Sequence, residues 1–111
     1  MSGSSKLTPR LAPLLEWAQR NPERRRQFEP LAGGLLVKVR IDHTEMRHVL
    51  LARVGAKGPS DQECRTVLAH WPEPVPAGVA WTAFQRGEYQ CCVAIWRPEK
   101  LGQQLELGGN V

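Results

Sequence analysis

The chain has 111 residues, of which 41% are hydrophobic and 23% are charged, and its formal net charge is +4. This size predicts one domain, and the composition excludes a disordered or membrane-embedded chain. No apolar run approaches the roughly 20 residues that span a bilayer, and the N-terminus lacks the apolar segment of a secretory signal. We therefore expect a cytoplasmic protein.

The N-terminal segment predicts a disordered start followed by a helix. Residues 1–7 are mostly small and polar, which is typical of a disordered terminus. Pro13 predicts that the regular helix begins there, or is kinked there after a turn capped by Thr8. The helix carries an apolar stripe at helical spacing, which needs a partner surface because a short isolated helix is marginal in water. The stripe consists of Leu7, Leu11, Leu14, Leu15 and Ala18.

A second short helix is predicted over residues 22–28. Asn21 is a favourable N-cap, Pro22 suits the first helical position, and Glu23 faces the positive end of the helix dipole. Pro30 and the glycines at 33 and 34 would end it.

The next segment predicts an antiparallel hairpin. Apolar residues alternate with other side chains over residues 35–41, and again over 47–54, which is typical of strands. The connecting stretch IDHTEMRH concentrates two carboxylates and two imidazoles, but its histidines lie five apart across a bend. The zinc motif HExxH needs them four apart on one helix face. Asp, Thr and His are ordinary turn formers, so we interpret residues 42–45 as the hairpin tip.

A third helix and a second hairpin follow. Ser60 and Glu63 have the spacing of a capping box, and the apolar residues after them lie on one helical face up to Trp71. The proline-rich linker over 72–78 should be extended. Over residues 79–96, Gly87 suits a type II′ turn, a register that pairs Phe84 with Cys91 and Trp81 with Ala94. Both faces of this hairpin are substantially apolar, which predicts either burial on both sides or an uncovered face carrying Trp81 and Trp96.

The predicted order is therefore helix, helix, strand, strand, helix, strand, strand. This order is typical of an α+β domain with helices packed on a four-stranded, mostly antiparallel sheet. We expect a single domain over residues 8–97. Residues 98–111 are a polar tail in which 104–107 is a weak strand candidate.

The sequence points to neither a metal site nor an enzyme. Three cysteines without a C-x2-C pair match neither a disulfide framework nor a structural zinc site. Cys91 or Cys92 could act as a nucleophile with His48 or His70, although a central strand seldom provides a positioned base. No nucleophile elbow, P-loop or dinucleotide-binding motif is present. We therefore expect a non-enzymatic protein that carries no cofactor.

The first functional hypothesis is a regulator or adaptor that binds another protein, as a homodimer. Its basis is an N-terminal leucine stripe larger than a small domain can bury, together with tryptophans, which are enriched in interface hot spots. The alternative for each of these residues is that it completes the core. The predicted contact residues are Leu7, Leu11, Leu14, Leu15, Trp17, Trp81 and Trp96.

The second functional hypothesis is nucleic-acid binding. Residues 1–40 contain eight Lys or Arg and three Glu, a net charge of +5, whereas residues 41–111 contain seven basic and eight acidic residues, a net charge of −1. One basic surface could bind phosphates, while Trp81 and Trp96 stack on bases. The alternative is an ordinary solvated face, since +4 is a modest charge for a phosphate binder. The predicted basic residues are Arg20, Arg24, Arg25, Arg26, Lys38, Arg40, Arg47 and Arg53.

Overall fold

The structure, a computed structural model, describes residues 7–98 and belongs to the predicted α+β class. Its elements are α1 (Leu7–Arg20), β1 (Glu29–Pro30), the 3-10 turn η2 (Ala32–Gly34), β2 (Leu36–Ile41), β3 (Arg47–Val54), α2 (Asp61–Ala69), β4 (Thr82–Arg86) and β5 (Tyr89–Trp96). α1 begins at Leu7 and runs through Pro13. The predictions for residues 1–6 and for most of the C-terminal tail, including the strand candidate at 104–107, lie outside the described residues.

The strands form one antiparallel sheet in the order β1-β2-β3-β5-β4. Both predicted hairpins are present, and β4 pairs with β5 in the predicted register, with Phe84 opposite Cys91. Gly87 has a φ of 58° while Glu88 keeps a negative φ, as a type II′ turn requires. The pairing of Trp81 with Ala94 is absent because β4 begins only at Thr82. The sheet also gains a fifth strand, β1, which at two residues is too short to show alternation.

The predicted second helix over residues 22–28 is wrong. Asn21 does not cap a new helix, because its side-chain Nδ2 donates to the Trp17 carbonyl at 2.8 Å and closes the end of α1. Glu23 then takes a φ of 69°, outside the helical region, and its N–H donates to the Ile41 carbonyl at 2.7 Å. Within residues 22–28, Phe28 is the one apolar side chain after Pro22. A helix here would therefore have had no apolar face to bury.

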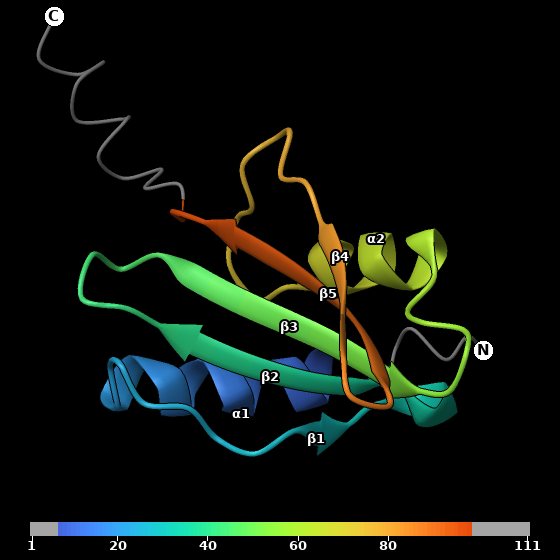
Figure 1. Ribbon diagram of the computed structural model, residues 1–111. Coiled ribbons are helices and arrows are strands. Elements are labelled where there is room, and N and C mark those ends of the chain that lie inside the picture. The colour runs from blue at the N-terminus through green and yellow to red at the C-terminus, as the bar shows by residue number, and fades with distance from the viewer. Residues whose placement is uncertain (1–6, 99–111) are drawn as a thin grey trace, which may run out of the picture.

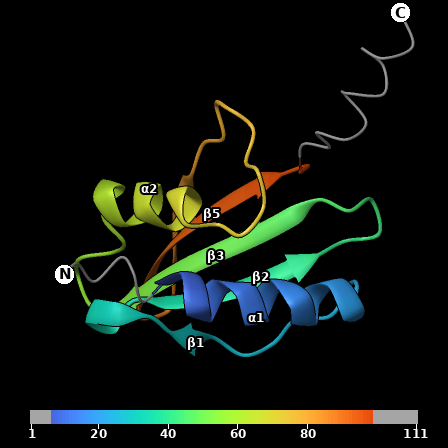
Figure 2. The same cartoon turned by 180° about the vertical axis from the view of Figure 1, so that it is seen from behind.

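The two α-helices cover one face of the sheet and leave the other face open. Figure 1 looks onto the open face, with α1 and α2 behind the strands, and Figure 2 shows the helical layer in front. The alternation of each strand separates the two faces. Val39 opposite Val49, and Val49 opposite Ala94, are buried beneath the helices, whereas Lys38 opposite Leu50 belongs to the open face.

The leucine stripe of α1 packs on this sheet. Leu11 and Ala18 have no exposed surface, and Leu14 and Leu15 are buried in the same core. These four residues of the stripe therefore have their partner surface within the chain, and they are not available to a second subunit or another protein. For them, the expectation that a small domain cannot bury the stripe is wrong, since the inward faces of the strands supply enough apolar surface.

Two arginines of β3 point into the helical layer, one near each end of the strand. Arg47 is 5% exposed and forms a two-pronged ion pair with Glu73, with Nε to Oε1 at 3.0 Å and Nη2 to Oε2 at 2.7 Å. The indole of Trp71 donates to the same carboxylate at 3.2 Å. Arg53 forms a similar pair with Glu63, at 2.7 Å and 2.5 Å. These pairs attach the proline-rich linker and the start of α2 to the central strand.

We predict that Glu73→Gln destabilises the fold by about 3 kcal/mol, because it leaves the buried Arg47 guanidinium without its counter-charge. Urea unfolding at neutral pH measures the change. The control is Glu29→Gln, which removes an exposed partner 3.8 Å from Arg26 and should cost less than about 0.5 kcal/mol. A Glu73→Gln variant as stable as this control would show that the buried ion pair does not hold the linker.

Candidate functional site

The open face of the sheet contains a cleft of about 200 Å³ built by side chains from four strands and from the segment after α1. Alternation places the strand side chains there, since they lie on the face opposite the buried valines. The lining residues are Arg25, Lys38, Arg40, His48, Leu50, Phe84, Arg86 and Val93. Four of them are permanently cationic and none is a carboxylate.

The cations of the cleft are less neutralised than those of the helical layer. Among the described residues, neither Arg25 nor Arg86 forms an ion pair, and the Lys38 ammonium lies 4.4 Å from the centre of the Phe28 ring. Arg40 has only a distant carboxylate, Glu23 Oε1 at 3.8 Å. The cleft therefore presents a positive potential to a ligand.

Aromatic rings lie near these cations. Phe84 is 36% exposed, although it sits within the cleft. Phe28 stacks on Tyr89, with ring centroids 6.2 Å apart and planes inclined by 17°. Partly exposed rings among cations combine two features used by proteins that bind single-stranded nucleic acids, namely stacking surfaces and phosphate contacts.

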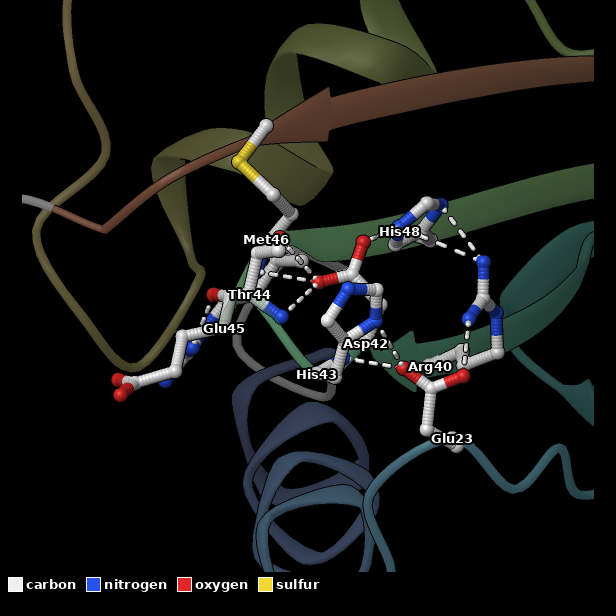
Figure 3. Close-up of polar contacts among 9 residues, drawn as sticks. Glu23, Arg40, Asp42, His43, Thr44, Glu45, Met46 and His48 are labelled. Carbon is white, nitrogen blue, oxygen red and sulfur yellow. Dashed lines mark hydrogen bonds and ion pairs between the residues drawn. The ribbon is translucent and has the colours of Figure 1, made fainter.

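The predicted hairpin tip is confirmed (Figure 3). Two residues beside it, Arg40 and His48, line the cleft. The Asp42 carbonyl accepts from the Glu45 N–H at 2.9 Å, and the Asp42 N–H donates to the Met46 carbonyl at 3.2 Å. Asp42 Oδ1 also accepts from the Thr44 hydroxyl at 2.6 Å and from the Met46 N–H at 3.1 Å. Hydrogen bonds from Thr44, then from His48, hold the pKa of the Asp42 carboxyl well below its usual range. The carboxylate thus acts as the organising acceptor of the tip.

His48 and Arg40 are held next to each other on the cleft side of this tip (Figure 3). His48 Nε2 lies 2.8 Å from Asp42 Oδ2, and the Arg40 Nη2 group lies 3.3 Å from His48 Nδ1. The same Nη2 group lies 3.4 Å from His48 Nε2, so the guanidinium contacts both ring nitrogens. Glu23 completes the cluster by accepting from the backbone and the ring of His43. The cluster fixes the orientation of two cleft residues.

The structure places few of the predicted partner-binding residues on a surface. Besides the buried leucines, Trp96 is 4% exposed and meets Trp71 edge-on, with centroids 5.3 Å apart. Trp81 is partly buried against the same core. The indole Nε1 atoms of Trp81 and Trp96 are buried without a hydrogen-bond partner. The face that carries these tryptophans is therefore the covered one, and the predicted uncovered Trp surface is wrong. The side chain of Leu7 is outside the described part of the structure.

The remaining predicted residues divide between the two sides of the sheet. Arg47 and Arg53 point to the helical layer and are engaged by carboxylates, so they do not belong to an exposed basic surface. Trp17 is half-buried beneath the Arg26 guanidinium, which lies 5.4 Å from its ring centre. Arg20 and Arg24 are exposed outside the cleft. Of the predicted basic residues, Arg25, Lys38 and Arg40 do meet in the cleft.

Sequence reasoning missed Phe84, Arg86 and the pair of Phe28 with Tyr89 as site residues. The signal for two of them was present, because the predicted hairpin register already put Phe84 and Arg86 on one face. The sequence did not reveal which face of the hairpin the helices cover. That face depends on the pairing of β3 with β5, which lie far apart in the sequence.

Among the described residues, the metal-ligating side chains are dispersed. No group of three or more His, Cys, Asp or Glu side chains comes together there to hold a metal ion. Burial raises the pKa of the Cys91 thiol, and burial together with the neighbouring Cys92 raises that of Cys64 to about 12. A thiol in this state is a poor nucleophile. None of the described helices has the length and apolar character needed to cross a bilayer.

Comparison with known proteins gave no relative: no protein-family model, curated protein or solved structure matches the chain.

We predict that Glu63→Gln lowers stability in a pH-dependent way. The hydrogen bonds from Arg53 lower the pKa of Glu63, so this carboxylate stabilises the fold above its unfolded-state pKa of about 4.5, and the effect is lost as the pH falls through the lower folded value. Gln preserves the capping box, so the substitution removes mainly the charge. At pH 7 the variant should be about 1.5 kcal/mol less stable, and the gap should close below about pH 4.5.

Urea unfolding over a pH series measures this gap. Glu16→Gln is the control, because Glu16 is exposed and forms no ion pair within the described residues, and its gap should stay close to zero. A Glu63→Gln gap that is the same at every pH would contradict the assigned role of the charge.

Proposed function

We propose that this protein is a non-enzymatic binding module whose open sheet face takes up single-stranded nucleic acid. The observation that carries the proposal is the cleft itself, in which Arg25, Lys38, Arg40 and Arg86 surround an apolar and aromatic floor and no carboxylate lines the wall. Phosphates would bind the cations, and bases would lie against Phe84 and the neighbouring rings.

The difference between the two faces of the sheet supports this reading. The arginines that point inward, Arg47 and Arg53, are each matched by a carboxylate at two positions. The arginines that point outward have one distant partner between them, the Glu23 carboxylate near Arg40. Cations gathered in a cleft without counter-charges favour an anionic ligand. Contacts to the phosphates of a nucleic acid are largely independent of its base sequence, so we propose that the protein has only a weak preference among bases.

A protein partner is the second candidate, and a specific observation favours it. Ile95 is 47% exposed and Val54 is 52% exposed, and both lie on the open face together with Phe84. Apolar side chains beside unpaired cations would suit an acidic protein segment. This second candidate keeps the regulatory or adaptor role expected from the sequence, but it places the partner-binding surface on the open face of the sheet instead of on α1.

The cysteines bear on where such binding takes place. Cys64, Cys91 and Cys92 are free thiols, which is typical of a reducing compartment. They support the proposal that the protein acts in the cytoplasm.

We predict that the wild-type protein binds a short single-stranded oligonucleotide at low salt, and that its affinity falls as salt is added. Replacing Lys38 and Arg86 by alanine should weaken binding and reduce the salt slope by about 0.7 for each phosphate contact that is lost. Phe84→Ala should weaken binding about tenfold through lost stacking. Fluorescence anisotropy at several salt concentrations measures both effects.

The control for charge is Arg65→Ala, which removes an exposed cation from α2 in the helical layer and should leave the affinity unchanged. Equal losses from Arg65→Ala and from the cleft variants would contradict a defined site. Absence of oligonucleotide binding at low salt, together with cleft-dependent binding of a glutamate-rich peptide, would replace the nucleic-acid proposal by the second candidate.

A further inference from the structure

The two edges of the sheet differ in how they are protected against pairing with another strand. One edge is β1, which has two residues and ends in Pro30, a residue without an N–H to donate. Short edge strands and prolines are common means of preventing edge-to-edge association. The other edge is β4, which has five residues, all exposed, and contains neither proline nor glycine. β4 is hydrogen-bonded to β5 on one side, and within residues 7–98 no strand pairs with its other side, which carries the backbone groups of an edge strand.

The sequence of β4 is self-complementary when two copies are placed antiparallel about Phe84. Thr82 of one copy then faces Arg86 of the other, Ala83 faces Gln85, and the two Phe84 side chains face each other. The single charge on the strand, Arg86, thus meets a hydroxyl and never a second arginine. An aromatic pair at the centre stabilises such an arrangement, and like charges in direct opposition would have opposed it.

We propose that β4 pairs with β4 of a second copy about a two-fold axis through Phe84, which joins two five-stranded sheets into one continuous sheet. The proposed partner at this edge is therefore a second copy of the same chain. The proposal rests on the edge of the sheet, and its central residue, Phe84, also lines the cleft.

The pairing has a consequence for the open faces. Phe84 and Arg86 lie on the open side of β4, so both copies bring these residues to the junction. Ala83 and Gln85 lie on the other side of β4, away from the cleft. Substitutions at Ala83 and Gln85 can therefore test the pairing without altering the cleft.

The experiment compares two double variants of equal size in sedimentation equilibrium. Ala83→Lys with Gln85→Lys places lysine opposite lysine twice in the proposed register, whereas Ala83→Lys with Gln85→Glu places lysine opposite glutamate twice. We expect the wild-type protein to dimerise, the lysine–lysine variant to dimerise at least about tenfold more weakly, and the lysine–glutamate variant to dimerise as tightly as wild type or more tightly. Circular dichroism checks the fold of each variant.

Amide hydrogen exchange of the wild-type protein provides a measurement without substitutions. We expect amides of β4 to become more protected as the protein concentration rises through the dimerisation range, while those of β1 do not change. A wild-type protein that remains monomeric at hundreds of micromolar would overturn the proposal. So would a lysine–lysine variant that dimerises as tightly as wild type, or equal weakening of both variants.

Discussion

The buried ion pair of Arg47 and Glu73 is the interaction on which the arrangement of the two layers depends. Arg47 begins β3, the strand that pairs with both β2 and β5, and its guanidinium is almost completely enclosed. An enclosed charge is costly unless it is matched, so the proline-rich segment after α2 must run where Glu73 can reach Arg47. The indole of Trp71 donates to the same carboxylate and lies against Trp96. One polar contact thus orders a segment that has no regular structure of its own.

The ion pair also determines which basic side chains point to the open face of the sheet. Once Arg47 points inward, strand alternation sends Arg53 inward as well and sends His48 outward. The pairing of β2 with β3 then puts Lys38 and Arg40 beside Leu50 and His48 on the open face. Whether a basic residue reaches the open face therefore depends on its position along the strand, because neighbouring side chains of a strand point to opposite faces of the sheet. The inward arginines are paired with carboxylates, and the outward cations line the cleft.

This division explains how far the sequence could predict the structure. Local signals were sufficient for both hairpins, for the capping box of Ser60 and Glu63, and for the register that pairs Phe84 with Cys91. They failed at residues 22–28, where the helix-start signals of Asn21 and Pro22 were outweighed by the lack of apolar side chains to bury. They also failed for Trp81 and Trp96. The covered face of the second hairpin is fixed by the contact of β3 with β5, and about 35 residues separate these strands in the sequence, so no local pattern reports it.

The hairpin tip gives the clearest case of a polar motif whose chemistry is structural. Asp42 and both imidazoles are engaged in local contacts, with Asp42 accepting from Thr44, Met46 and His48, and the ring of His43 lying against Glu23. The Glu45 side chain is exposed. Glu45 takes a φ of 68°, a left-handed conformation that costs a non-glycine residue about 1 kcal/mol or more. The surrounding hydrogen bonds to Asp42 hold the tip in this shape. The result is that His48 and Arg40 line the cleft in fixed orientations, which would reduce the entropy that the proposed anionic ligand loses in ordering its binding site.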